Sequence, residues 1–521
     1  MPETISGQNL AVGLRALDYA VLAVAIGLLF LITYFAGRRE KDTRDYFLGG
    51  RGIPWLVVCL SFVATEVSAV TIVSVPATGY SENMQYLQFF VGSALAKVFV
   101  AFLFIPAFYR HDCTTVYQYL GQRFGPGTQY AGSAFFFITR LLASGVRLYA
   151  ACLGIKVILG WTLLQALLLF TLVSILFIAF GGIKAVVWNG AYETLVFYAA
   201  AMAVGAFLLM NVDGGLARVW EVAGDPKFNR LSVWNFKLDL ADPTTFWAGG
   251  LNAFFVGLAV FGTDQELVQR LLTAETRRSS QKALVGTIFA ALPVTFMYLA
   301  LGVLLFVFYR QHPQLLGTFE NKEVLSHFTV NFLPAGMKGL VLAAIVLASI
   351  DSPLSSLSSS FVTDIYRPLI NRNASERHYL RVSRFGVIGF GLVLGLLAVA
   401  CSPLKSILWV AFQVLSVTGG ATLGVFLLGL LTKRRGNLAN ILAMITSAFW
   451  MLALMFMSKY QGLKLGWSWL IVIGTVSTFV LGYVFSLLEE RGRVQKAKLA
   501  AANAGPDSGS DLRSGQPPVA S

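Results

Sequence analysis

Long apolar runs recur along almost the whole of this 521-residue chain, separated only by short polar or Pro/Gly-rich breaks. Helical runs of about 18 or more apolar residues match the hydrocarbon thickness of a lipid bilayer. Because the bilayer core holds no water to bond free peptide groups, such runs can cross it only as helices. Charged residues make up 13% of the chain, against roughly 25% in soluble domains. The sequence therefore predicts an all-α integral membrane protein without a large soluble domain.

Thirteen apolar segments have lengths near the ~20 residues that a helical span requires. We predict transmembrane helices at about 17–37, 54–80, 86–109, 130–159, 161–180, 186–210, 247–272, 283–309, 336–363, 384–402, 404–431, 437–457 and 469–487. The first segment has no basic region before it and is followed by Arg38, Arg39 and Lys41. This pattern argues against a cleaved signal peptide, so we expect the segment to remain as a membrane helix.

The distribution of Lys and Arg predicts the orientation of the chain. Cytoplasmic loops carry an excess of these residues, and an odd number of helices places the two termini on opposite sides. With an external N-terminus, the cytoplasmic segments hold 25 Lys and Arg, the external segments 12, and three lie within helices. The net charge of +14 is then an orientation signal and not a sign of nucleic-acid binding. We expect a multi-pass protein of the plasma or inner membrane with a cytoplasmic C-terminus.

The domain organisation follows from the same pattern. Residues 1–487 are predicted to form one transmembrane domain, and the polar residues 488–521 a disordered cytoplasmic tail, because a Gly/Ser/Pro/Ala-rich stretch cannot bury a core. The four His residues lie in loops or at their edges, and the four Cys residues show no CxxC spacing. The sequence thus offers no constellation for an intramembrane enzyme. It also lacks the filter motif of a channel and the signalling domain of a sensor.

Ionisable side chains at membrane depth are costly and usually mark a functional pathway. The predicted helices contain Glu66, Lys97, Arg140, Arg147, Glu193, Asp264 and Asp351. Because an unpaired buried charge is strongly unfavourable, we expect a charge network of Glu66, Lys97, Arg140, Arg147 and Glu193 whose members are partly paired with one another. A direct contact of Glu66 with a solute is the alternative.

The segment 336–363 carries the most informative polar pattern. Four serines, Ser349, Ser352, Ser356 and Ser359, recur every three to four residues, so their hydroxyls should share one helix face beside Asp351. Oxygen ligands on one face suit a small hard cation. The alternative is that the serines permit close helix packing, which does not require a carboxylate.

Two segments carry the residues of a helix break. The run 63–71 is unusually rich in hydroxyls for the middle of a span, and Phe-Gly-Thr-Asp occupies 261–264. In transporters, unwound turns between half-helices expose carbonyl oxygens that coordinate ions. A break is plausible at 261–264. At 63–71 the composition leaves both a break and a continuous helix open, since neither Gly nor Pro is present.

At this point the chain resembles a known family, the sodium:solute symporters, which include the sodium-coupled sugar, sialic acid and vitamin transporters. The matching pieces are RDYFLGGRGIP (44–54), ATEVSAVTIVSVPATGY (64–80), FGGIKAVVW (180–188), GTDQELVQR (262–270), SSSFVTDIY (358–366) and GGATLGVFLLG (419–429). The resemblance implies a leucine-transporter-type core of two inverted five-helix repeats, about 54–210 and 247–431. One extra helix precedes this core and two follow it.

The resemblance also implies a sodium site. Its ligands would be the backbone carbonyls of Ala64, Val67 and Ile345 and the hydroxyl of Ser349. Many members have a second hydroxyl where this chain has Ala348, so Asp351 or water would have to complete the coordination.

A second sodium site in many members uses an Asp two residues after the tryptophan of the GG…W stretch, where this chain has Gly190. We hypothesise that the negative charge has moved to Asp351, which would bind the ion together with Ser352 and Ser349. Glu193, three residues after Gly190, is the rival candidate.

The solute is the least constrained part of the prediction. Sugar-recognising members have an acidic residue where this chain has Phe90, and sialic acid transporters have an Arg where it has Ala143, so neither substrate carries over. The candidate lining residues, Thr65, Glu66, Ser68, Thr71, Tyr86, Phe90, Ser93, Thr263 and Gln265, suit a small polar organic solute. Arg140 and Arg147 favour an anion, whereas Glu66 favours an amine or a proton.

We therefore expect a sodium-coupled symporter that imports a small polar organic solute by alternating access. It would act as a monomer, with sodium as the coupling ion and no organic cofactor. A proton-coupled transporter of the same fold is one alternative. A membrane channel or a sensor without coupled transport is the alternative from a different class.

Overall fold

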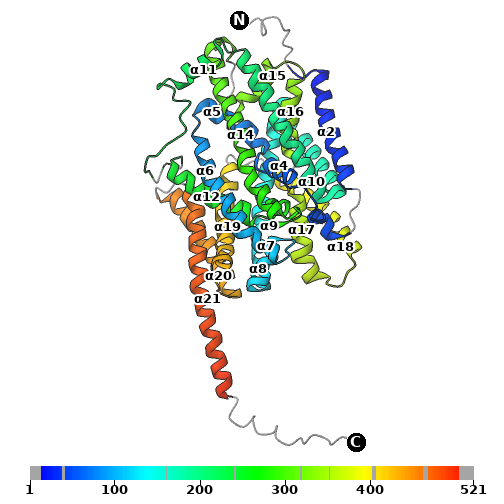
Figure 1. Ribbon diagram of the computed structural model, residues 1–521, viewed down its shortest axis with the longest axis vertical. Coiled ribbons are helices and arrows are strands. Elements are labelled where there is room, and N and C mark those ends of the chain that lie inside the picture. The colour runs from blue at the N-terminus through cyan, green and yellow to red at the C-terminus, as the bar shows by residue number, and fades with distance from the viewer. Residues whose placement is uncertain are drawn as a thin grey trace, which may run out of the picture.

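The structure is a computed structural model that describes residues 13–37, 42–159, 161–239, 242, 244–316, 320–350, 353–401, 407–461 and 467–503. The regular elements in these residues are helices that form one bundle, with a single isolated parallel bridge between Ile53 and Ala274 (Figure 1). The all-helical membrane fold predicted from the apolar runs is confirmed for this part of the chain.

The longest helices are α2 (Ala16–Gly37), α9 (Pro126–Leu159), α10 (Leu163–Met210), α14 (Arg277–Gln311), α18 (Glu376–Cys401), α19 (Ile407–Leu431), α20 (Asn437–Tyr460) and α21 (Leu470–Asn503). Shorter helices that end or change pitch within a predicted span are α4 (Trp55–Glu66), α5 (Ala69–Ser81), α6 (Phe89–Phe99), η3 (Val100–Phe104), α7 (Ile105–Arg110), α12 (Phe246–Thr263), α13 (Gln265–Leu272), α16 (Met337–Ile350), α17 (Leu354–Ser360) and η6 (Phe361–Ile370). The connections contain α3 (Thr43–Leu48), η1 (Gly49–Arg51), η2 (Gln85–Gln88), α8 (Val116–Phe124), α11 (Gly215–Gly224), η4 (Pro313–Leu315), η5 (Asn321–Glu323), α15 (Val324–Phe332) and η7 (Trp467–Trp469).

The number of membrane-spanning helices differs from the thirteen expected from the sequence. Over the described ranges, eleven helices are long and apolar enough to cross a membrane, or twelve if the bent pair α4 and α5 is one span. The predicted spans 161–180 and 186–210 fall on the single helix α10, which accounts for the difference.

Helix α10 is bent at Gly182. Its 48 residues would extend about 72 Å as a straight helix at 1.5 Å per residue, more than twice the hydrocarbon thickness of a bilayer. Gly182 has φ 50° and ψ −156°, a conformation that interrupts the helix and that only glycine adopts readily. The bend therefore divides α10 into two segments of different direction.

Two spans are broken near their middle, at the positions that the sequence marked. Helix α4 ends at Glu66 and α5 begins at Ala69, and the two meet at 62°. Val67 and Ser68 between them have extended backbone angles. Helix α12 ends at Thr263 and α13 begins at Gln265, with Asp264 extended between them. The break at 261–264 and the one left open at 63–71 are both present.

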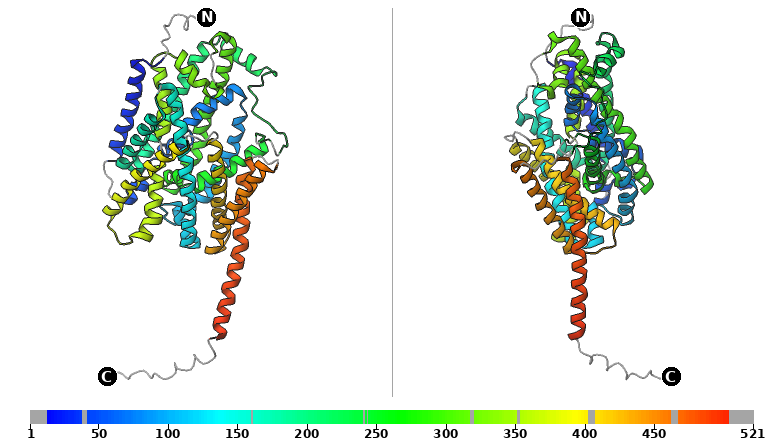
Figure 2. Two further views of the ribbon diagram at one scale, coloured as in Figure 1. Left: turned by 180° about the vertical axis from the view of Figure 1, so that it is seen from behind. Right: turned by 90° about the vertical axis from the view of Figure 1, so that its left-hand side faces the viewer.

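Helix α21 continues to Asn503, whereas the sequence predicted a disordered tail from residue 488. It projects away from the bundle in all three ribbon views (Figures 1 and 2). Glu490 pairs with Arg434 at 2.7 Å, and Glu489 accepts a hydrogen bond from the Ala439 N–H at 3.0 Å. These contacts hold α21 against the start of α20. Residues 504–521 lie outside the described residues.

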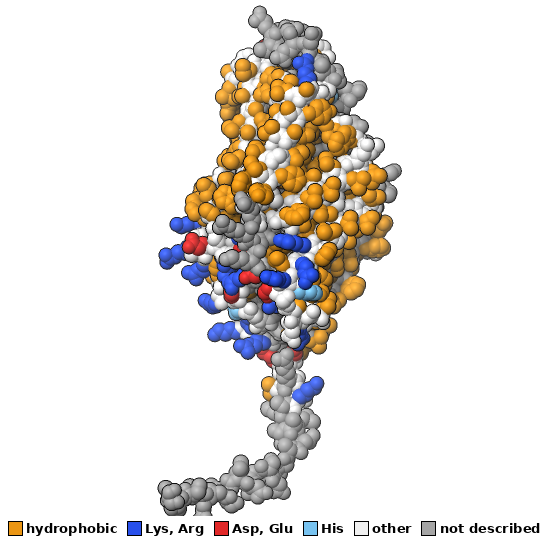
Figure 3. Space-filling view, turned by 90° about the vertical axis from the view of Figure 1, so that its right-hand side faces the viewer, with side chains coloured by type: hydrophobic (Ala, Val, Ile, Leu, Met, Phe, Trp, Pro, Cys, Tyr) orange, Lys and Arg blue, Asp and Glu red, His pale blue; other side chains and the backbone are white. Residues whose placement is uncertain are grey.

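One face of the molecule separates apolar from charged side chains (Figure 3). Hydrophobic side chains cover the upper part of this face, while Lys and Arg gather towards the end from which α21 projects. This arrangement is typical of a membrane protein whose lipid-facing surface is apolar and whose loops carry the charge.

Candidate functional site

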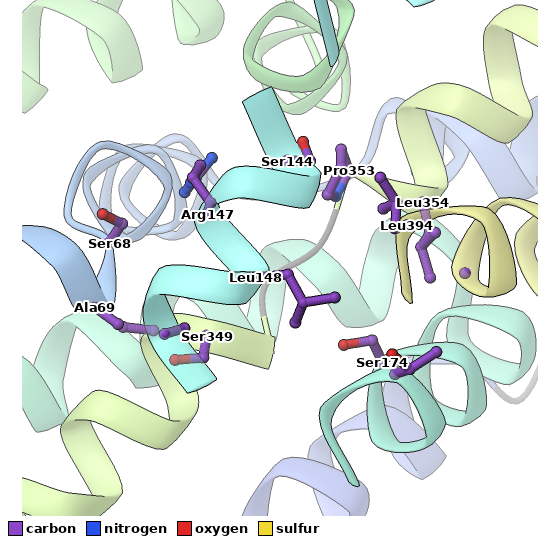
Figure 4. A pocket seen from close by; sticks show the side chains of 14 residues that line it. Ser68, Ala69, Ser144, Arg147, Leu148, Ser174, Ser349, Pro353, Leu354 and Leu394 are labelled. Carbon is purple, nitrogen blue, oxygen red and sulfur yellow. The ribbon is translucent and has the colours of Figure 1, made fainter. Parts of the chain in front are cut away.

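The break between α4 and α5 lies against the end of α16, and a cavity runs between them (Figure 4). Ser68 and Ala69 line it from the break, and Ala348 and Ser349 from α16. Helices α9, α10 and α18 complete the wall. The structure thus places the α4–α5 break next to the end of α16, the two segments that carry the sodium ligands implied by the family resemblance.

The break changes the local hydrogen bonding because Ser68 begins a new helix. The Ser68 N–H donates to Thr71 Oγ1 at 3.3 Å, and the Thr71 N–H donates to Ser68 Oγ at 3.4 Å, which forms a capping box. The Val67 N–H still donates to the Val63 carbonyl at 3.0 Å. The helical bond from the Ser68 N–H to the Ala64 carbonyl is therefore not continued, and the last carbonyls of α4 are available to a ligand.

On α16, two of the predicted sodium ligands touch each other. Ser349 Oγ donates to the Ile345 carbonyl at 2.6 Å. Helix α16 ends at Ile350, whose carbonyl accepts a hydrogen bond from Ser174 Oγ at 3.0 Å. The next two candidates, Asp351 and Ser352, lie outside the described residues.

The serines further along do not share the cavity with Ser349. Ser356 Oγ donates to the Pro353 carbonyl at 2.8 Å, and Ser359 Oγ donates to the Ser356 carbonyl at 3.0 Å. Ser359 also accepts from Gln265 at 3.3 Å. The predicted single face of four serines is wrong for Ser356 and Ser359, because α16 ends at Ile350, a new helix begins at Leu354, and neither hydroxyl lines the cavity of Ser349.

Glu66 at the end of α4 pairs with Lys97 on α6. The Lys97 Nζ lies 2.8 Å from Glu66 Oε1 and 2.9 Å from Oε2, and the Lys97 side chain is fully buried. The ammonium also lies 5.1 Å from the centre of the Phe261 ring and 5.5 Å from that of Phe90. This cation is thus neutralised by one carboxylate and faces two aromatic rings.

The two arginines belong to a different cluster. Arg140 on α9 contacts the carboxylates of Asp264 and Glu266, at the second helix break. Arg147 lies 4.0 Å from Glu266, while Asp264 Oδ1 accepts from the Glu266 N–H at 2.9 Å. The expected partial pairing is therefore present for Glu66 and Lys97, whereas Arg140 and Arg147 pair with carboxylates at the α12–α13 break that the predicted network did not include. Sequence analysis missed Glu266, although it follows Asp264 by two residues.

Glu193 and its neighbours lie on the second part of α10. Glu193 is buried, and the Asn189 amide donates to Thr33 Oγ1 on α2 at 2.9 Å. Gly190 packs directly on α4, since a Cβ there would lie 2.5 Å from Ser61 Oγ. Ser61 therefore occupies the space beside Gly190, the position where many family members have an Asp. The Ser61 hydroxyl also accepts a hydrogen bond from Arg270 at 2.8 Å.

The remaining lining candidates divide into two groups. Gln265 is held by the start of α8 and the residues before it, because its Oε1 accepts from the Val116 N–H at 2.9 Å and its Nε2 donates to the Thr114 carbonyl at 3.0 Å. Thr65 and Thr263 donate to carbonyls one turn earlier in their own helices. Those that stay partly accessible are Ser68, Thr71, Tyr86, Phe90 and Ser93.

Three hydroxyl-bearing residues of the cavity were missed by the sequence analysis, namely Ser144 on α9 and Thr171 and Ser174 on α10. Ser144 precedes Arg147 by three residues, so both point to one side of α9. That spacing is the only sequence signal that could have selected Ser144. Thr171 and Ser174 stand in an apolar run with no such signal.

Comparisons with known proteins agree with this architecture. The sequence model of the sodium:solute symporter family matches residues 46–447. The chain is 28% identical over 483 residues to the sodium/sialic acid symporter of Aliivibrio fischeri. That match covers 90% of this chain and 92% of the symporter. It is 31% identical over 452 residues to the sodium-dependent multivitamin transporter of Oryctolagus cuniculus. That match covers 82% of this chain and 68% of the transporter.

The structure also resembles a solved one. It matches a Na+-coupled sialic acid symporter in a substrate-bound outward-open state with a TM-score of 0.82 and 26% identity, over 91% of this chain and 98% of that one. The broken helices and the helices around the cavity lie within residues 46–447, which the family model covers. The chain therefore belongs to the sodium:solute symporter family, whose members are sodium-coupled membrane transporters and not enzymes.

Proposed function

We propose that sodium binds where the α4–α5 break meets α16 and drives the import of a small polar organic solute. The ligands are the carbonyls of Ala64, Val67 and Ile345 and the hydroxyl of Ser349. The observation that carries this proposal is the cavity lined by Ser68 and Ala69 from the break and by Ser349 from α16. Carbonyl and hydroxyl oxygens at a helix break are suitable ligands for a hard cation.

Asp351 and Ser352 complete the ion site in this proposal. In the sequence they follow directly on Ile350, the last residue of α16. A carboxylate there supplies the anionic oxygen that the chain lacks at Gly190. The packing of Gly190 against Ser61 supports this placement, since it leaves no room for a side chain at the usual position.

Coupling arises because ion and solute favour the same conformation. Sodium connects the broken helix α4–α5 to α16, and a solute bound beside the breaks contacts the same elements. Each ligand then stabilises the state that the other binds, which is symport in thermodynamic terms. The proton-coupled alternative has less support, because its best candidate, Glu66, is already paired with Lys97.

We further propose thirteen spans, with α10 crossing twice on either side of Gly182 and α4–α5 as one span. The N-terminus is external, the C-terminus cytoplasmic, and the protein acts as a monomer in the plasma or inner membrane. The repeats comprise about 54–210 and 247–431 within a single domain, residues 1–487. The concentration of Lys and Arg near the end from which α21 projects supports this orientation (Figure 3).

Thermal unfolding of the purified full-length protein tests the sodium site. Sodium chloride should raise the melting temperature relative to potassium chloride, because a ligand that binds only the folded state stabilises it by mass action. Ser349→Ala should abolish this difference. Ser356→Ala is the matched control, since its hydroxyl bonds the Pro353 carbonyl at 2.8 Å and does not line the cavity. Equal melting in sodium and potassium for the wild type would refute the proposal.

A further inference from the structure

The cavity beside Ser349 has a definite electrostatic character. Among the described residues that line it, Arg147 is the only charged one, and the others are apolar or carry hydroxyls. Figure 4 shows Ser68, Ala69 and Ser349 on the left-hand side of the view, with Arg147 above them. Beside Arg147, away from the sodium site proposed at Ser349, one fixed cation and several hydroxyls favour an anionic ligand over a purely apolar one.

Arg147 is the most loosely held cation of its cluster. Its guanidinium lies 4.0 Å from Glu266, whereas Arg140 contacts both Glu266 and Asp264. The Arg147 side chain is 31% exposed, against 8% for Arg140. Arg140 thus makes the close contacts with both carboxylates at the α12–α13 break, while Arg147 supplies a second, more distant positive charge and also lines the cavity.

Two hydroxyls point to the same ligand site. Ser144 Oγ and Thr171 Oγ1 are buried and have no hydrogen-bond partner among the described residues. Ser144 is only 4% exposed and lies on the Arg147 side of α9, while Thr171 comes from α10. A buried hydroxyl without a partner costs free energy, so a polar ligand that accepts from both would recover that cost.

We propose that the transported solute is a small organic anion whose carboxylate binds Arg147, Ser144 and Thr171. A guanidinium and two hydroxyls present several donors to two carboxylate oxygens, which suits a planar anion. The positive charge of Arg147 opposes a second cation at this position. The proposal rests on the proposed sodium-coupled function and assigns its substrate class. It agrees with the carboxylic acid named for the sialic acid relatives.

The position of this anion site explains coupling by direct attraction. Ser349 lines the same cavity as Arg147 and Ser144. A sodium ion at Ser349 and a carboxylate at Arg147 would attract each other in a medium of low dielectric constant. Each ligand would then raise the affinity of the other by the same factor.

The test uses thermal unfolding of the full-length protein in lipid nanodiscs at constant sodium concentration. The probes are the sodium salts of acetate, lactate and benzoate, each compared with its neutral amide, with sodium chloride as the balancing salt. At least one carboxylate should raise the melting temperature while its amide does not. The same carboxylate as its potassium salt, in potassium chloride, should have a much smaller effect.

Three variants separate binding from structure. Ser144→Ala and Thr171→Val should each unfold at the same or a higher temperature without ligand, since each removes an unpaired buried hydroxyl. Each should weaken the apparent carboxylate affinity about tenfold. Arg147→Gln should weaken it more, and Arg147→Lys less than Arg147→Gln. Ser468→Ala, which removes another buried hydroxyl without a partner on the far element η7, should leave the carboxylate response unchanged.

Each outcome bears on a different claim. If sodium stabilises the protein but no carboxylate does, or the amides act equally, the anion site is refuted and the sodium proposal stands. If Ser144→Ala and Thr171→Val leave the carboxylate response intact, the anion lies elsewhere and the assignment is overturned. If sodium itself has no effect, the proposed function fails first.

Discussion

The carboxylate of Asp18 accepts a hydrogen bond of 2.9 Å from the backbone N–H of Gly339. Asp18 is on α2, outside the predicted core, and Gly339 is in the first turn of α16. The same Oδ1 also accepts from the Gly336 N–H at 2.7 Å. A negative charge at a helix N-terminus satisfies free N–H groups and interacts favourably with the helix dipole. Helix α2 therefore fixes the start of α16, the helix that carries Ser349.

Asp18→Ala should lower the free energy of unfolding by about 1–3 kcal/mol, because the N–H groups of Gly336 and Gly339 lose a charged acceptor. Asp18→Asn keeps an acceptor without the charge and should cost less. Thermal unfolding in the same buffer compares the variants. A role for α2 in the sodium site would also appear as a reduced melting difference between sodium and potassium. Full stability of Asp18→Ala would show that α16 starts correctly without this contact.

Glu66→Gln should destabilise the protein strongly, because it leaves the buried ammonium of Lys97 without its carboxylate. Removing one partner of a buried ion pair costs about 3–5 kcal/mol. The double variant Glu66→Gln with Lys97→Met should recover part of this loss, since methionine packs well between the rings of Phe90 and Phe261. A double-mutant cycle from unfolding measurements gives the interaction free energy between Glu66 and Lys97. If Glu66→Gln folds normally and changes only solute selectivity, Glu66 contacts the solute instead.

Gly182→Ala should reduce the yield of folded protein and cost about 1–3 kcal/mol, because φ 50° with ψ −156° is strained for any residue with a Cβ. Gly27→Ala is the matched control, since a Cβ there meets no atom within 4 Å and the residue lies inside the regular helix α2. It should be neutral or slightly stabilising. Size-exclusion profiles and melting temperatures distinguish the two variants. Similar behaviour of both would argue against the bend at Gly182.

The orientation proposal predicts opposite labelling of two loops. Cysteines introduced by Lys227→Cys, between α11 and α12, and by Arg372→Cys, before α18, lie at exposed positions. The native Cys59, Cys113 and Cys152 are buried. An impermeant thiol reagent applied to intact cells should label the first position, and the second only after permeabilisation. Labelling of both positions in intact cells would refute the topology.

Asp351→Asn should sharply weaken the sodium dependence of stability and transport, because the ion site would lose its anionic oxygen. Glu193→Gln should have little effect on that dependence. An Asp at position 190 would return the carboxylate to the place where many family members have it, but a Cβ there would lie 2.5 Å from Ser61 Oγ. We therefore expect Gly190→Asp to restore sodium dependence only together with Ser61→Gly. Strong loss in Glu193→Gln alone would assign the charge to Glu193.

The sequence determined the class of the protein and the approximate positions of its helices. Apolar length is a one-dimensional property, and a bilayer allows only helices to satisfy the peptide groups, so the membrane fold could be predicted without coordinates. The composition of 63–71, by contrast, left a break and a continuous helix both open. The sequence also marked Asp264 as a break, because a polar residue after glycine ends an apolar run.

Only the tertiary structure decided which buried groups meet. Residues Glu66 and Lys97, or Arg140 and Glu266, are far apart in the chain, and no periodicity states which helix faces which. The same holds for Ser144 and Thr171, whose small hydroxyls look like packing residues until a cavity is seen between α9 and α10. Pairing and cavity shape depend on how separate helices pack in three dimensions, and a single sequence does not encode that packing in any local pattern.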